Sequence, residues 1–80
     1  MDNKIAAKKV IGAKQTLKAI RSGNAEVVYI ARDAEPRVIN PIVELCHENE
    51  IDLVYYNSMC ELGKACCIDV GAATVCVIKE

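Results

Sequence analysis

Positively charged side chains recur at helical spacing in one short stretch near the start of the chain, directly after a glycine. The stretch runs from Gly12 to Arg21 and places Lys14, Lys18 and Arg21 on one face of a predicted helix. The first turn of a helix presents unpaired backbone N–H groups and the positive end of the helix dipole, and both bind anions. Lysines beside them suit an anionic backbone such as phosphate, whereas the simpler interpretation is a solvated face of a surface helix.

A second unusual stretch is the apolar loop predicted at residues 67–72. It carries Ile68 and Val70, although loops usually leave such side chains to the core. Two interpretations are open. The side chains either fold back and complete the core, or they and the backbone N–H groups of the loop contact an unstacked base.

The other reactive residue types form no catalytic or metal-binding pattern. The chain has five cysteines, no Cys-x-x-Cys spacing and a single histidine, His47, directly beside Cys46. We expect no metal, no cofactor and five free thiols, with Cys46, Cys66 and Cys76 as small buried hydrophobes. No Ser/His/Asp set, catalytic carboxylate pair or phosphate loop is present, so we expect a non-enzymatic protein. A thiol-redox enzyme using Cys66 and Cys67 is a distant alternative.

Charge is unevenly distributed along the chain. Its net charge is −1, but residues 1–23 carry six cations against one carboxylate, and residues 24–80 carry four cations against ten carboxylates. This asymmetry indicates an anionic partner at the basic end. The 80 residues, of which 52% are hydrophobic, predict one globular domain. No apolar run approaches the roughly 20 residues of a membrane span, and no apolar signal region follows Met1, so we expect a cytoplasmic protein.

Hydrophobic periodicity predicts alternating helices and strands. We expect helices at 3–9, 13–22 and 59–66, a helical region that ends near residue 49, and strands at 10–11, 26–31, 51–56 and 73–78. Such alternation gives a central sheet with helices on both faces. The sequence therefore predicts an α/β protein, a three-layer α/β/α sandwich with a mixed four-stranded sheet.

The helical region before residue 49 contains a proline within its apolar pattern. We prefer a separate turn at 36–39, after which Asn40 caps a helix with Pro41 in its first position. A single kinked helix is the alternative, because proline removes one backbone hydrogen bond.

The last predicted helix begins with a capping box. The hydroxyl of Ser58 accepts from the backbone three residues later, and the Glu61 side chain reaches back to the start. Helical spacing predicts that Met59, Leu62 and Cys66 face inward.

Four blocks of sequence, in order, resemble the kink-turn-binding ribosomal protein superfamily of the L-seven-Ae and L-thirty-e type, especially its small bacterial members. The resemblance covers nearly the whole chain and implies an α/β/α sandwich that binds RNA kink-turns. The blocks are Gly12-x-Lys14-Gln15-Thr16-x-Lys18, Ile30-Ala31-x-Asp33-Ala34-x-Pro36, Leu62-Gly63-Lys64-Ala65-Cys66 and Ile68-Asp69-Val70-Gly71-Ala72-Ala73.

The resemblance also implies roles for individual residues. Lys14 and Gln15 occupy positions where archaeal members usually carry Asn and Glu, which read guanines of the tandem sheared G·A pairs. Lys18 matches a lysine that contacts RNA, and the loop matches one that covers the unstacked nucleotides and tunes RNA preference. Cys67 stands where the family pattern predicts glycine, so a positive φ there would bear on the loop conformation. The implied RNA-binding residues are Gly12, Ala13, Lys14, Gln15, Lys18, Ile68, Asp69, Val70, Gly71 and Ala72.

The predicted function is therefore non-enzymatic binding of a kink-turn in ribosomal or other non-coding RNA, in association with the ribosome and without a membrane. The alternative is a small protein–protein adaptor that docks an acidic partner on its basic N-terminal face. A preference for kink-turn RNA over plain duplex separates the two.

Overall fold

The computed structural model describes residues 8–79, which form a four-stranded sheet and three helices. The strand order is β1–β4–β2–β3; β2 and β3 are parallel, and β4 is antiparallel to both β1 and β2. This is the predicted mixed sheet. The elements are β1 (Lys9–Ile11), α1 (Ala13–Arg21), β2 (Ala25–Ala31), α2 (Pro36–Glu48), β3 (Asp52–Tyr56), α3 (Met59–Ala65) and β4 (Thr74–Ile78).

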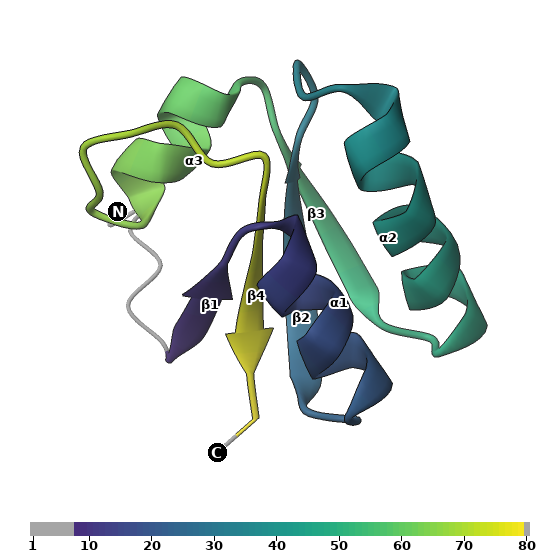
Figure 1. Ribbon diagram of the computed structural model, residues 1–80. Coiled ribbons are helices and arrows are strands. Elements are labelled where there is room, and N and C mark those ends of the chain that lie inside the picture. Colours follow the sequence, from purple (N-terminus) through teal and green to yellow (C-terminus); the bar gives the residue numbers. More distant parts are fainter. Residues whose placement is uncertain (1–7, 80) are drawn as a thin grey trace.

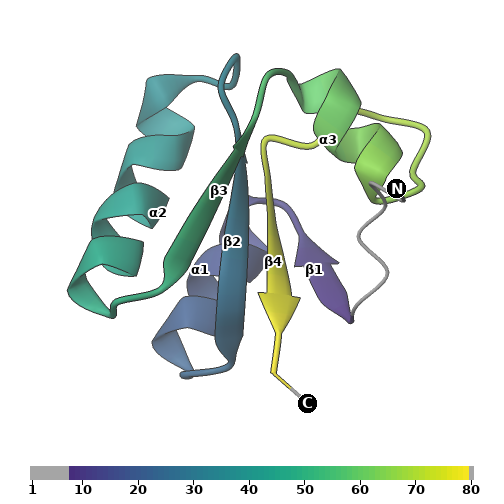
Figure 2. The ribbon, with the colours of Figure 1, turned by 180° about the vertical axis from the view of Figure 1, so that it is seen from behind.

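The helices lie on both faces of the sheet, as Figures 1 and 2 show: α1 and α2 cover one face and α3 covers the other. Alternate residues of each strand point to opposite layers. Val28 and Cys76 pack with α1 and α2, whereas Val75 and Val77 pack with α3. Burial of each aliphatic side chain stabilises the folded state by about 1.5–3 kcal/mol. The two apolar clusters, one on each face of the sheet, therefore hold the three layers together.

Most element boundaries agree with the sequence predictions to within one residue at either end. The predicted helix at 3–9 falls largely outside the described residues. Its last residue, Lys9, instead begins β1 and pairs with Val77 of β4. That part of the prediction is wrong, because the β4 edge offers Lys9 a hydrogen-bonding partner that the local sequence does not reveal.

The preferred interpretation of α2 is also wrong. Residues 36–48 form one continuous helix that begins with Pro36 in its first turn, and both Asn40 and Pro41 lie inside it. A proline at the start is preorganised for a helix, so the first turn forms without Asn40 as a cap. An interior proline costs about 3 kcal/mol, but the helix completely buries Ile42 and Cys46 against the sheet, and that burial offsets the cost.

The start of α3 follows the predicted capping box in part. The backbone N–H of Glu61 donates to Oγ of Ser58 at 3.1 Å, and Leu62 and Cys66 are buried as expected. Met59 is not: it is 37% exposed. Its N–H and carbonyl are both hydrogen-bonded to residues outside α3, and the residue lines a surface groove.

Candidate functional site

The first turn of α1 has no side-chain cap. Gly12 precedes the helix with φ 103° and ψ 155°, a conformation that favours glycine, and offers no side chain to the backbone N–H groups that follow. Lys14 and Gln15 are exposed beside these groups, whereas Thr16 on the opposite face is fully buried. The structure therefore presents the polar groups of the first turn to solvent and anchors the helix through its other face.

The cationic face continues along α1. Lys18 and Arg21 are exposed one and two turns beyond Lys14, and α1 contains no acidic residue. Leu17 lies half-buried between them. Because helical side chains three and four positions apart are neighbours, these residues form one continuous positively charged surface.

The loop after α3 begins with a residue in the left-handed conformation. Cys67 has φ 61°, so the position where the family pattern predicts glycine does adopt a positive φ, with a cysteine. Ile68 N donates to the carbonyl of Gly63, and Cys67 N donates to that of Lys64, which is the Schellman arrangement at the end of a helix. These two hydrogen bonds offset the roughly 1–2 kcal/mol that the left-handed conformation costs a non-glycine residue.

The loop then lies directly on α3. A Cβ atom at Gly63 would overlap the backbone carbonyl of Val70, and one at Gly71 would lie 3.1 Å from Cβ of Met59. The absence of side chains at Gly63 and Gly71 thus permits the close approach. In this position Ile68 packs against the core, whereas Val70 is 70% exposed. Ile68 therefore folds back on the core, as the first interpretation predicts, whereas Val70 remains exposed and its contact with an unstacked base stays a prediction.

Backbone hydrogen bonds place the turn before α1 and the end of the loop at the same end of the sheet. Gly12 N donates to the carbonyl of Thr74 at 3.0 Å, and Ala31 N donates to that of Ala73 at 2.9 Å. The turn before α1 and the end of the loop are therefore direct neighbours, although about 60 residues separate them in sequence. The tip of the loop lies over α3, in the opposite layer from α1 (Figure 1).

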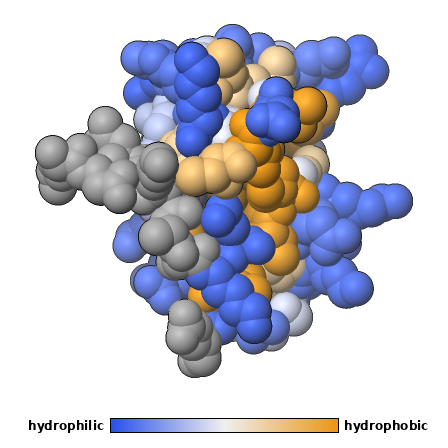
Figure 3. All heavy atoms as spheres, turned by 90° about the vertical axis from the view of Figure 1, so that its left-hand side faces the viewer, coloured by the Kyte–Doolittle hydropathy of each residue, from blue (hydrophilic) through white to orange (hydrophobic). Residues whose placement is uncertain are grey.

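Apolar side chains are exposed on the α3 side of the molecule. Figure 3 looks onto the left-hand side of Figure 1, where both α3 and β1 lie, and shows an apolar patch between polar surroundings. Val70 is the most exposed large hydrophobic residue among residues 8–79. Its exposure provides an apolar surface on the loop that a ligand could cover.

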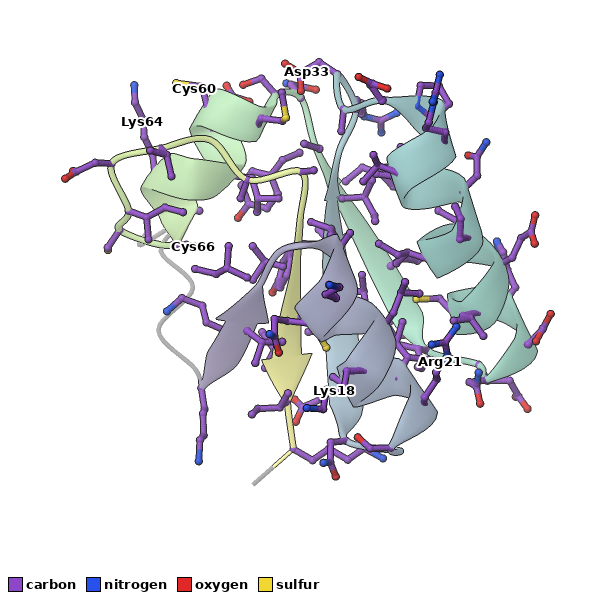
Figure 4. All side chains as sticks on the ribbon, in the orientation of Figure 1. Lys18, Arg21, Asp33, Cys60, Lys64 and Cys66 are labelled. Carbon is purple, nitrogen blue, oxygen red and sulfur yellow. The ribbon has the colours of Figure 1, made fainter. Side chains whose placement is uncertain are left out.

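A groove beside the loop contains two charged residues that sequence reasoning did not place in the site. Asp33 and Lys64 line a cavity of about 540 Å³ together with Met59 and Val70. Figure 4 shows Asp33 at the same end of the molecule as Cys60 and Lys64, which belong to α3. Asp33 and Lys64 belong to the second and third blocks of the family pattern, and this was the feature of the sequence that could have placed them in the site.

The thiols of the core are poor nucleophiles. Burial raises the pKa of both Cys46 and Cys76 to about 11, and burial is also the main cause of the raised pKa of Cys66. Since the thiolate is the reactive form, a raised pKa argues against a redox role for Cys66. Within residues 8–79 there is no group of three or more His, Cys, Asp or Glu side chains that could hold a metal ion.

None of the helices in the described part of the chain has the length and apolar character needed to cross a membrane.

Comparison with known proteins identifies the relatives of this chain. Residues 2–80 match the ribosomal protein L7Ae/L30e/S12e/Gadd45 family. The chain is 55% identical over 67 residues to an RNA-binding protein of Caldanaerobacter subterraneus, covering 84% of this chain and 82% of that protein. It is 40% identical over 74 residues to the RNA-binding protein YbxF of Geobacillus stearothermophilus, and the match covers 92% of this chain and 90% of that protein.

A solved structure shares the fold as well as part of the sequence. The 15.5kD RNA-binding protein of Giardia lamblia superimposes with a TM-score of 0.85 and 30% identity over 91% of this chain, which spans 62% of that protein. A second structure, from Bacillus halodurans, has a TM-score of 0.82 at 19% identity and supports the fold alone. The match over residues 2–80 and the 55% identity establish that the chain belongs to the ribosomal protein L7Ae/L30e/S12e/Gadd45 family.

Proposed function

We propose that residues 1–80 form a single, non-enzymatic RNA-binding domain that recognises kink-turns. The observation that carries the proposal is the hydrogen bond from Gly12 N to the carbonyl of Thr74, which holds the uncapped, cationic start of α1 beside the end of the apolar loop. This end of the sheet thereby brings the backbone N–H groups and lysines of α1 next to the end of the loop, whose exposed aliphatic tip lies over α3 in the opposite layer. The bacterial relatives and the Giardia protein are named as RNA-binding proteins, which supports the same function here.

The two parts of the surface take different roles in this proposal. Lys14 and Gln15 are exposed at the first turn and read base edges near the kink, whereas Lys18, one turn further, binds phosphate. The loop from Ile68 to Ala72 covers unstacked nucleotides, and Val70 packs against a base. Division of labour between charged and apolar contacts is typical of proteins that recognise a distorted RNA rather than a regular duplex.

The RNA is ribosomal or another structured non-coding RNA, and the protein acts in the cytoplasm in association with the ribosome. Membership of a family that contains ribosomal proteins supports this setting. The uneven charge supports it as well, because the basic surface of α1 attracts a polyanion while the acidic remainder of the chain limits how much RNA it binds without specificity.

Binding of two matched RNAs tests the proposal. One is a kink-turn; the other is identical except that Watson–Crick pairs replace the tandem sheared G·A pairs. Loss of specific base contacts costs about 1–3 kcal/mol each, so we expect the Kd for the kink-turn to be lower by at least about tenfold. Fluorescence anisotropy at constant salt measures both. Equal affinities would contradict kink-turn recognition, and the absence of any RNA binding would favour the adaptor function.

A further inference from the structure

A groove along α1 extends well beyond the residues that match the family pattern. It has a volume of about 680 Å³ and is lined by Lys14, Gln15, Leu17, Lys18, Arg21 and Ser22. Figure 4 shows Lys18 and Arg21 projecting from the second half of α1, away from the first turn. All six residues belong to α1 or to its C-cap, so the groove follows the helix from its first turn to its end.

The charge in this groove is not neutralised by neighbouring side chains. Between residues 8 and 79 the one ion pair within 4.0 Å joins Arg37 to Glu35 at the start of α2, and none involves α1. Ser22 lines the groove but offers no hydrogen-bond donor to a ligand, because its hydroxyl donates to the carbonyl of Ala19 at 3.1 Å. The cations of α1 are therefore available to an external anion.

The spacing of these cations suits a nucleic-acid strand. Lys14 and Arg21 are seven residues apart, which is about 10 Å along a helix axis. On each strand of B-form DNA, phosphates follow one another about every 3.4 Å of helix axis, so a length of about 10 Å corresponds to about three phosphates at that spacing. Arg21 also differs from the lysines, since a guanidinium binds phosphate oxygens in pairs.

We propose that the RNA-binding surface continues along α1 to Arg21, which binds a backbone phosphate of a duplex stem that flanks the recognised bases. The inference rests on the proposed function and extends it from the kink to the neighbouring stem. The same side chains also have a role in the fold itself. Lys18 and Arg21 lie in the last turn of α1, where their positive charges stabilise the helix by interacting with the negative end of its dipole. The test must therefore separate RNA contact from helix stability.

The first experiment compares Arg21→Gln with wild type on the kink-turn RNA over a range of salt concentrations. Glutamine keeps the helix propensity but removes the charge. We expect binding to weaken about three- to tenfold and the slope of log Kd against log salt to fall by about 0.7–0.9, the value of one phosphate contact. Arg21→Lys restores the slope. The matched control is Arg37→Gln, which removes an equally long cation whose side chain is 87% exposed on α2, and its slope stays at the wild-type value.

The second experiment locates the contact on the RNA. The two stems of the kink-turn are shortened in turn, one base pair at a time. When the contacted base pair is removed, wild type falls to the affinity of Arg21→Gln, and the variant itself loses nothing further at that step. Melting temperatures of all variants verify that binding is measured on folded protein, and the salt slope is independent of a change in helix stability.

The outcomes distinguish the phosphate contact by Arg21 from the proposed recognition of kink-turns. If wild type prefers the kink-turn while Arg21→Gln keeps the wild-type slope, the contact by Arg21 is refuted and the proposed function stands. The same holds if Arg37→Gln lowers the slope as much as Arg21→Gln does. If wild type shows no preference for the kink-turn, the proposed function fails first and the inference falls with it.

Discussion

Asp33 and Met59 are joined by a hydrogen bond between segments 26 residues apart: the Met59 backbone N–H donates to Oδ1 of Asp33 at 2.7 Å. The carbonyl of Met59 in turn accepts from Ala72 N at 3.1 Å, and its Cβ packs against Gly71. Asp33 thus fixes the first residue of α3, and that residue fixes the end of the loop. A side chain in the β2–α2 connection therefore positions the loop that we propose to contact RNA.

Replacement of this carboxylate is expected to affect both stability and binding. A hydrogen bond with a charged partner contributes about 1.5–3 kcal/mol, so Asp33→Ala should lower the free energy of unfolding by about that amount in urea titrations. Binding of kink-turn RNA should weaken in addition, because the loop is less well positioned. Ser58→Ala is the matched control: it removes the other cap of α3, costs about 1 kcal/mol, and leaves RNA affinity unchanged. Equal effects of the two variants on RNA affinity would contradict a positioning role for Asp33.

Gly63→Ala tests the close contact between the loop and α3. The added methyl group overlaps the Val70 carbonyl, so the loop must move, and overpacking of this kind costs about 1–3 kcal/mol. Gly71→Ala, whose methyl group meets Met59 at 3.1 Å, should be milder. Urea titration and RNA binding of both variants check the order. A Gly63→Ala protein with wild-type stability would show that the loop does not rest on the helix as described.

Substitutions of the α1 side chains should differ in how their effects on binding depend on the RNA sequence and on the salt concentration. Gln15→Ala should cost about 1–3 kcal/mol on a kink-turn and much less on the Watson–Crick control RNA, as expected for a base contact. Lys18→Ala should weaken binding to both RNAs similarly and lower the salt slope by about one phosphate contact. Anisotropy titrations at several salt concentrations measure both. A uniform effect of Gln15→Ala would make the start of α1 a phosphate clamp without base recognition.

Val70→Ala should weaken RNA binding without changing the salt slope, because its contribution is apolar. The side chain is 70% exposed, so its truncation should leave the melting temperature within about 1 °C of wild type. Ile68→Ala is the contrasting variant: Ile68 packs against the core, and its loss should lower stability. A large drop in melting temperature for Val70→Ala would mean that this residue supports the loop rather than the ligand.

The raised pKa of two buried cysteines predicts that the free energy of unfolding decreases at alkaline pH. The pKa of Cys46 and Cys76 is about 11 in the folded protein instead of 9.0, so the folded state holds these protons more tightly than the unfolded state. Their contribution to stability is complete below about pH 9 and is lost as pH rises toward 11. Urea titrations of wild type and Cys46→Ala across this window measure the effect, which should be smaller in the variant.

Thiol titration provides an independent measurement on the same residues. Cys60 and Cys67 are exposed and should react rapidly in the native protein, whereas Cys46, Cys66 and Cys76 should react only after unfolding. Denatured, unreduced protein should yield all five thiols. A reproducible disulfide would overturn the expectation of free cysteines.

Local patterns in the sequence were sufficient for the elements that depend on neighbours along the chain. The helical stripe of α1, the β-branched run of β2 and the cap of α3 by Ser58 are interactions over at most a few residues, and each occurs where its pattern predicts it. The resemblance to the family identified Cys67 as an unusual residue at a glycine position, and the positive φ was found there. The RNA contacts that the resemblance implies stay a prediction.

Long-range contacts decided what the local patterns could not. Pro41 stays inside α2 because the sheet buries Ile42 and Cys46, and that gain exceeds the cost of one lost backbone hydrogen bond. Met59, which is 37% exposed, is held at the start of α3 by Asp33, which lies far away in sequence and accepts from its N–H. The pairing of Gly12 with Thr74 likewise follows from strand order, which places the ends of β1 and β2 beside the start of β4. Burial and hydrogen bonding between distant segments exist only in the folded chain, and so does the assembled surface.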